Sequence, residues 1–238
     1  MMKGLLAIYR REFASYFTSW MGWIVLAAFL GFMGFFFYKT MLEDKFADMR
    51  GFFSWLPIIF LFFCPAVAMR LIAEEKKIGA FEILLTLPLS DWQVVLGKYL
   101  AAVSFISVAL ICTWPMPLTV HLVGAVDMGA IWSGYVGSFL LGAAFVAIGL
   151  FASSLVKDQV LAFILGLVLS FVLFIAGVSQ INSYFPEWLV FYMNKVSLLY
   201  HFNSLGRGVV DSRDVAYFLG TILFFLFSSV VTLEARKW

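Results

Sequence analysis

Residues able to do chemistry gather in one short stretch, AEEKKIGAFEILLTLPLSDWQVVLGK (residues 73–98), between two long apolar runs. Such a cluster is unusual here, because only 13% of the 238 residues are charged and 63% are hydrophobic. Within it Ile78, Phe81, Leu84 and Leu85 follow an i, i+3, i+6, i+7 pattern, which predicts an amphipathic helix. Such a helix is suited to binding another protein, because an apolar stripe flanked by charges fits a groove on a partner.

The sequence also indicates where this helix ends and where the next one begins. Pro88 stops it, and Ser90 with Gln93 forms a capping box for the next helix. The rest of its surface is charged: Glu74, Glu75, Lys76, Lys77 and Glu82. The alternative is a helix that only lies on lipid headgroups. Headgroups favour a basic helix, so three Glu against two Lys favour a protein groove.

No other motif predicts catalysis or cofactor binding. The chain has two histidines, His121 and His201, and no H-E-x-x-H or G-x-G-D pattern; neither histidine has an evident nucleophile and carboxylate beside it in the sequence. Cys64 and Cys112 lie in apolar runs and are interpreted as buried hydrophobes. We therefore predict no catalytic residue, metal or cofactor in this chain. Net charge is only +2 and the basic residues are scattered, which argues against a nucleic-acid partner.

The composition predicts an all-α, polytopic membrane protein, since about 20 apolar residues are needed to cross the roughly 30 Å hydrocarbon layer. Six runs without Asp, Glu, Lys or Arg qualify as membrane spans: 20–38, 52–69, 99–122, 131–156, 160–179 and 215–233. Because these runs contain no charged residue, the sequence does not indicate an ion or proton pathway through the membrane. Close helix contacts are expected at small-residue pairs: Ala27 and Gly31, Ser138 and Gly142, Gly149 and Ser153.

Basic residues set the expected orientation. With both termini inside, the inner segments carry ten of them: Lys3, Arg10, Arg11, Arg70, Lys76, Lys77, Lys98, Lys157, Arg236 and Lys237. Six remain outside: Lys39, Lys45, Arg50, Lys195, Arg207 and Arg213. This excess obeys the positive-inside rule and predicts cytoplasmic termini.

Residues 3–17 precede the first span and predict a separate amphipathic helix in the inner interface, with Tyr9 and Phe13 on its apolar side and Arg10 and Arg11 on its polar side. The alternative is a simple extension of the first span. A cleavable signal peptide is not expected, because this segment lacks a continuous apolar core followed by small residues.

Two features are expected on the outer side. Pro115 and Pro117 should kink the third span. Residues 180–214 are interpreted as short helices in the outer leaflet anchored by aromatic rings, the alternative being a seventh span. The GRG turn and the charges after it suit a solvated loop with Asp214 capping the last helix, or a gate or docking site. The gate residues would be Trp188, Tyr192, His201, Arg207 and Asp211.

The motif EEKKIGAFEILLTLPLS resembles the cytoplasmic signature of ABC transporter permeases of the type 2 exporter class, the ABC-2 family. Ala80 stands where that family usually has Thr. The matching residues are Glu74, Glu75, Lys76, Gly79, Glu82, Leu84, Leu85 and Pro88. The segment YHFNSLGRGVVDSRDVAYFL is similar to the gliding-motility-associated and copper-maturation-type branch.

This resemblance implies a single permease domain over residues 1–238 in a bacterial inner membrane. Its helix over 74–88, which includes Phe81, would be the coupling helix that docks on an ATPase. The chain lacks a G-x-x-x-x-G-K-[ST] loop, so ATP and Mg would be bound by a separate ATPase subunit. Expected partners also include a second permease chain, membrane lipid and a periplasmic or accessory membrane protein. The alternative function is a membrane anchor or assembly subunit of an ATPase-driven envelope or motility machine, through which no substrate passes.

Overall fold

The computed structural model describes residues 2–44, 49–79, 90–123, 127–208 and 210–235. Across these ranges the regular secondary structure is helical. The helices are α1 (Met2–Thr18), α2 (Trp20–Asp44), α3 (Arg50–Ala68), α4 (Arg70–Lys77), α6 (Asp91–Cys112), α7 (Pro115–Val123), α8 (Met128–Leu155), α9 (Gln159–Ile175), α10 (Ser179–Asn182), α11 (Glu187–Val196), α12 (Leu198–Gly206) and α13 (Ser212–Glu234).

Within the described residues, five helical stretches are long and apolar enough to cross a membrane: Trp20–Leu42, Arg50–Lys77, Asp91–Leu122, Met128–Leu155 and Ser212–Glu234. The sixth expected span corresponds to α9, which is apolar but has only 17 residues. At 1.5 Å per residue, α9 is about 26 Å long, slightly less than the hydrocarbon layer. The chain is therefore a multi-pass membrane protein with five candidate spans and one shorter apolar helix.

The central helix is α8, which packs against α3, α6, α9 and α13. Its glycines permit this close packing, because a Cβ at Gly134 would lie 2.5 Å from the Phe53 ring and one at Gly149 would lie 2.7 Å from Ala68 Cβ. Small residues commonly allow such close approach between membrane helices. By contrast, a Cβ at Gly31 would meet no atom within 4 Å, so the expected close contact there is absent within the described chain.

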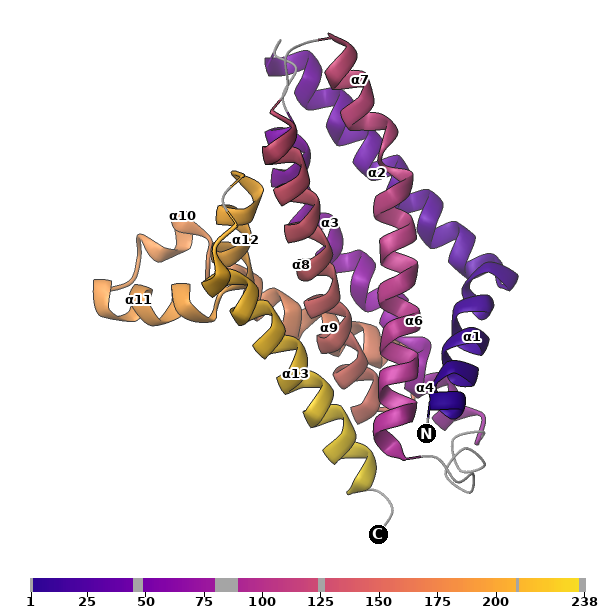
Figure 1. Cartoon of the computed structure of the whole chain (residues 1–238). Coiled ribbons are helices and arrows are strands. Elements are labelled where there is room, and N and C mark those ends of the chain that lie inside the picture. Colours follow the sequence, from indigo (N-terminus) through magenta and orange to yellow (C-terminus); the bar gives the residue numbers. More distant parts are fainter. Residues whose placement is uncertain (1, 45–48, 80–89, 124–126, 209, 236–238) are drawn as a thin grey trace.

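Figure 1 shows the start of α1, the end of α13 and the helix α4 at one end of the bundle. The start of α3 and helix α7 lie towards the opposite end, while α10 and α11 project from the side. The third expected span is broken into α6 and α7 at Thr113 and Trp114, directly before Pro115. The expected kink at the two prolines is therefore present.

One expected helix differs from the sequence-based prediction. The helix over 74–88 does not run unbroken, because α4 ends at Lys77 and Gly79 has φ +74°, a left-handed conformation that terminates helices. Glu74 and Glu75 thus belong to the continuation of the second span. Helix α1 packs lengthwise along α6: Ile8 abuts Gly97, and eight residues further on the Tyr16 ring stacks on Phe105 at 4.7 Å.

Candidate functional site

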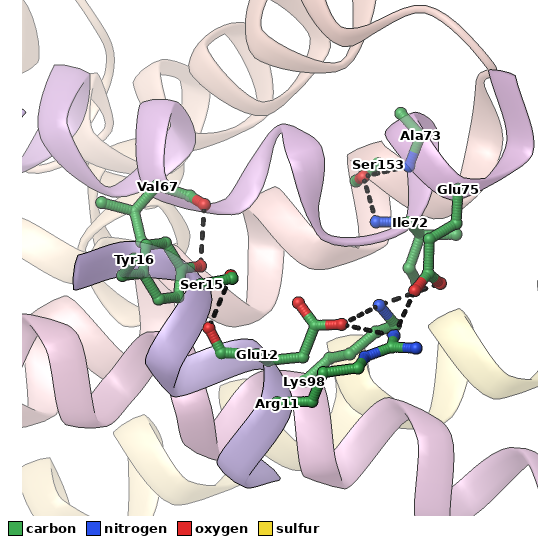
Figure 2. Close-up of polar contacts among 10 residues, drawn as sticks. All are labelled: Arg11, Glu12, Ser15, Tyr16, Val67, Ile72, Ala73, Glu75, Lys98 and Ser153. Carbon is green, nitrogen blue, oxygen red and sulfur yellow. Dashed lines mark hydrogen bonds and ion pairs between the residues drawn. The ribbon is translucent and has the colours of Figure 1, made fainter. Parts of the chain in front are cut away.

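Four charged side chains from three helices meet at the α4 end of the bundle (Figure 2). Lys98 Nζ on α6 lies 2.9 Å from Glu12 Oε1 on α1 and 2.9 Å from Glu75 Oε2 on α4. Arg11 Nη2 lies 2.8 Å from Glu12 Oε1 and 2.5 Å from Glu75 Oε1. We call these four residues the ionic cluster. Two cations and two carboxylates alternate in it, so its net charge is zero.

Three members of the ionic cluster are shielded from solvent, whereas the Arg11 side chain is 56% exposed. The Lys98 side chain is fully buried, while those of Glu12 and Glu75 are 14% and 15% exposed. Burial by itself would raise the pKa of Glu12, but the Lys98 ammonium and the Arg11 guanidinium together hold that pKa below its usual value. The hydrogen bond to Glu12 raises the pKa of Arg11 despite partial burial. Both charges are therefore stabilised by their neighbours, as a buried charge requires.

Local packing explains why α1 supplies two members of the ionic cluster. A Cβ at Gly97 would lie 2.9 Å from Ile8 Cγ2, so glycine lets α1 approach α6 closely. The next residue of α1 also contacts α6, because the Tyr9 hydroxyl donates to Ser104 Oγ at 3.2 Å. With Ile8 and Tyr16 buried against α6, the intervening Glu12 must also face inward.

A second polar contact joins α4 to the central helix α8. The Ser153 hydroxyl accepts from the backbone N–H groups of Ile72 and Ala73 at 3.1 and 3.0 Å, and donates to the Met69 carbonyl at 3.0 Å. These N–H groups belong to the first turn of α4, which has no side-chain cap of its own. Ser153 therefore caps α4 from another helix. Lys76 Nζ also donates to the Ser154 carbonyl.

The break between α3 and α4 is held by α1 as well. The Tyr16 hydroxyl donates to the Val67 carbonyl at 3.1 Å (Figure 2). The Arg70 guanidinium lies over the Tyr16 ring, 4.6 Å from its centroid. Helix α4 is thus tied to α1, α6 and α8, and its C-terminal end leads directly into the segment that the sequence identifies as the docking element.

The predicted coupling residues fall into three groups. Glu74 is exposed, as a partner-facing residue should be. Glu75 differs from the prediction, because its carboxylate points into the ionic cluster. Gly79 follows the end of α4. The remaining predicted coupling residues lie outside the described residues: Phe81, Glu82, Leu84, Leu85 and Pro88. Ser90 does start α6 as expected, with its N–H donating to Gln93 Oε1 at 3.3 Å.

The α1 residues chosen from the sequence separate into contacting and exposed sets. Tyr9 and Phe13 are half-buried and their rings stack at 5.8 Å. Arg10 is exposed, whereas Arg11 reaches inward to the ionic cluster from an exposed position. Three residues that make these contacts were missed: Glu12, Lys98 and Ser153. The sequence could have pointed to Lys98, because it is the one charged residue within the apolar stretch VVLGKYLAAV. Its partners could not be found in this way, because they are distant in the sequence.

The predicted outer-face residues do not form one site. Trp188 and Tyr192 are exposed on α11. Asp211 caps α13 by accepting from the Arg213 N–H at 2.9 Å, so the prediction that Asp214 caps this helix is wrong. Asp214 instead pairs with His201, whose Nδ1 lies 2.6 Å from Asp214 Oδ1. The two residues come together because α12 and α13 pack side by side.

The His201 pair resembles part of a hydrolase triad but lacks its geometry. The Ser204 hydroxyl donates to Asp214 Oδ2 rather than to the imidazole. The other ring nitrogen, Nε2, lies 3.3 Å from the Lys195 carbonyl. Within the described part of the chain, therefore, no nucleophile is presented to His201, as a triad would require. Among the described residues no group of three His, Cys, Asp or Glu could hold a metal ion.

The family model described as ABC-2 family transporter protein matches residues 6–207 of this sequence. That range includes α1, the charged stretch and the helices through α12, and so covers every member of the ionic cluster. A search of curated proteins gave no match.

Proposed function

We propose that this chain, which belongs to the ABC-2 transporter family, is a permease subunit driven by ATP hydrolysis in a separate ATPase subunit. Its family makes a membrane transport role and an ABC-type ATPase partner the general expectation. The observation that supports a specific mechanism is the ionic cluster, because it joins α1, α4 and α6 on both sides of residues 80–89.

In this mechanism residues 80–89 dock on the ATPase and the ionic cluster transmits the movement. The segment leaves from α4 and returns into α6, and Lys98 of α6 lies between carboxylates of α1 and α4. A force that the ATPase applies to residues 80–89 would therefore act on α1, α4 and α6 together. Rigid coupling follows because separating them would leave buried charges without partners, which costs several kcal/mol.

The proposed topology has six spans, with both termini in the cytoplasm of a bacterial cell and the chain in its inner membrane. The start of α1 and the end of α13 lie at one end of the bundle, which fits an even number of crossings (Figure 1). Helix α9 would be the sixth span despite its length, since a bilayer thins to match a short span at modest cost. Helices α10–α12 would then lie in the outer leaflet.

The proposed assembly contains two permease chains and two ATPase chains, with ATP and Mg bound by the ATPase. The second permease would be another copy or a related chain. A role in the gliding-motility-associated or copper-maturation-type branch is supported by the similarity of residues 200–219 to that branch, and a periplasmic accessory protein would fit the outer helices.

The test uses tagged chain purified from its own cells, with the ATPase identified in the complex by its nucleotide-binding sequence. Phe81→Ala should weaken ATPase binding by roughly ten- to a hundred-fold, since one large apolar side chain contributes about 1.5–3 kcal/mol when buried. Trp188→Ala, at the exposed position on α11, is the matched control and should leave binding unchanged. Normal ATPase binding by an inserted Phe81→Ala chain would overturn the docking role.

A backbone variant tests the same segment differently. Gly79→Pro should abolish productive docking, because proline fixes φ near −65° whereas Gly79 has φ +74°. In Gly79→Ala the new Cβ would meet no atom within 4 Å, so only the backbone preference of about 1–2 kcal/mol is lost. ATPase binding should therefore rank native, Gly79→Ala, Gly79→Pro.

A further inference from the structure

A polar pocket lies between the start of α3 and the end of α12. It has a volume of about 340 Å³, within the range of small-molecule sites. Its lining combines two guanidinium groups, two neutral polar side chains and two aromatic rings: Arg50, Arg207, Ser54, Asn203, Phe53 and Phe202. No acidic residue is among the described residues that line it.

The position of the pocket sets it apart from the ionic cluster. Helix α3 begins at Arg50 and extends 19 residues before α4, which places Arg50 about 28 Å from the α4 end of the helix. Arg50 and Arg207 must therefore lie near the opposite membrane surface or in a wet cavity, since an arginine in the hydrocarbon is costly. Figure 1 places the start of α3 away from α4.

The charged side chains that line the pocket are the two arginines. Arg207 occupies the C-cap of α12, where the helix end is partly negative, whereas Arg50 occupies the first turn of α3, where the helix end is partly positive. The partial charges of these two helix ends are opposite in sign and offset one another. Within the described residues Arg207 has no salt-bridge partner, so its guanidinium is available to a ligand from outside the chain.

The apolar part of the lining is fixed in place. Phe53 and Phe202 are both almost fully buried and hold their rings between α3, α8 and α12. Gly206 lies beside this aromatic pair, since a Cβ there would be in ordinary van der Waals contact with Phe53 Cβ at 4.0 Å. Buried aromatic rings next to two arginines suit an amphiphilic ligand whose polar group is anionic.

We propose that this pocket binds a phosphate-bearing ligand, with the phosphate between Arg50 and Arg207 and the adjoining apolar part on Phe53 and Phe202. Planar guanidinium groups bind phosphate through paired hydrogen bonds, and Asn203 and Ser54 can supply further donors. The ligand could be the headgroup of a membrane lipid or a soluble phosphate ester. The proposal concerns binding alone and does not depend on coupling to an ATPase.

The experiment measures ligand affinity of the purified chain by native mass spectrometry, without any ATPase. The probes are dioctanoyl phosphatidylglycerol, dioctanoyl phosphatidylcholine, glycerol 3-phosphate and inorganic phosphate. Arg207→Gln and Arg50→Gln should each weaken phosphatidylglycerol binding about ten-fold, the effect of losing one charge-assisted contact. Arg207→Lys should lose less, because the charge remains. Arg213→Gln is the control, being an exposed arginine nearby that does not line the pocket.

The soluble probes distinguish the two sources. If glycerol 3-phosphate displaces the lipid only weakly, the ligand is a lipid headgroup; if it binds as tightly as the lipid, the ligand is a soluble phosphate ester. Equal affinity of all the arginine variants for phosphatidylglycerol would overturn the proposal. So would an equal loss in Arg213→Gln, or phosphatidylcholine binding as tight as that of phosphatidylglycerol. Thermal unfolding of each variant checks that the fold is intact.

Discussion

At the scale of single residues, Lys98 is the most demanding group in the molecule. Its side chain is fully buried, and among the described residues its charge is balanced by Glu12 and Glu75 from other helices. The contact to Glu75 Oε2 is an ion pair without good hydrogen-bond geometry, whereas the contact to Glu12 is also a hydrogen bond. We therefore expect Lys98 to matter more than any exposed lysine.

Lys98→Met should lower the thermal midpoint of the detergent-solubilised chain. Breaking a buried ion pair costs about 3–5 kcal/mol because the remaining charges lose their partner, and the partial exposure of both glutamates favours the lower end. For a chain of this size that corresponds to roughly 6–12 °C. Lys77→Met is the control, since Lys77 forms only an exposed pair with Asp158. Equal midpoints for the two variants would contradict the role of Lys98.

A pH dependence follows from Glu12. Its pKa is lower in the folded chain than in the unfolded one, so its ionised form stabilises the fold above the ordinary glutamate pKa of about 4.3. That stabilisation is lost as pH falls through the folded-state pKa. The thermal midpoint should thus drop on acidification below about pH 4.5, and drop less in Glu12→Gln. Parallel curves for the two proteins would show that another group is responsible.

At the scale of elements, Ser153 shows how one helix end depends on another helix. Ser153→Ala would leave the N–H groups of Ile72 and Ala73 buried without acceptors, at a cost of about 1–3 kcal/mol. Ser154→Ala is the matched control, because that hydroxyl bonds only to the Phe151 carbonyl in its own helix. The free energy of unfolding in denaturant should separate the two, and Ser153→Thr should retain most of the stability.

The elements themselves were largely predictable, whereas their contacts were not. Hydropathy located the long apolar helices because lipid imposes length and apolar composition on a span. The end of α4 before Gly79 was missed because the apolar periodicity continues across it, although a glycine is a common residue just after a helix. The ionic cluster was missed because Glu12, Glu75 and Lys98 are 23 to 86 residues apart in the sequence.

At the scale of the whole molecule, the topology can be measured directly. In a chain carrying Cys112→Ser, Ile78→Cys should react with a membrane-impermeant thiol reagent only in inside-out vesicles, and Tyr184→Cys only in intact cells or spheroplasts. Both positions are well exposed, at 70% and 87%, and the remaining Cys64 is buried. Labelling of both from the same side would exclude six spans with cytoplasmic termini.

In the proposed mechanism α1, α4 and α6 move as one unit when the ATPase works. This mechanism is tested most directly by joining α1 to α4 covalently, using Arg11→Cys with Glu75→Cys in the Cys112→Ser chain and a short thiol-reactive cross-linker. The measurement is ATP hydrolysis by the reconstituted complex, before and after cross-linking, with each single-cysteine chain as control. We predict that cross-linking leaves hydrolysis at the rate of the same double variant without cross-linker. Loss of hydrolysis on cross-linking, with the ATPase still bound, would show that α1 and α4 must separate and would contradict the account.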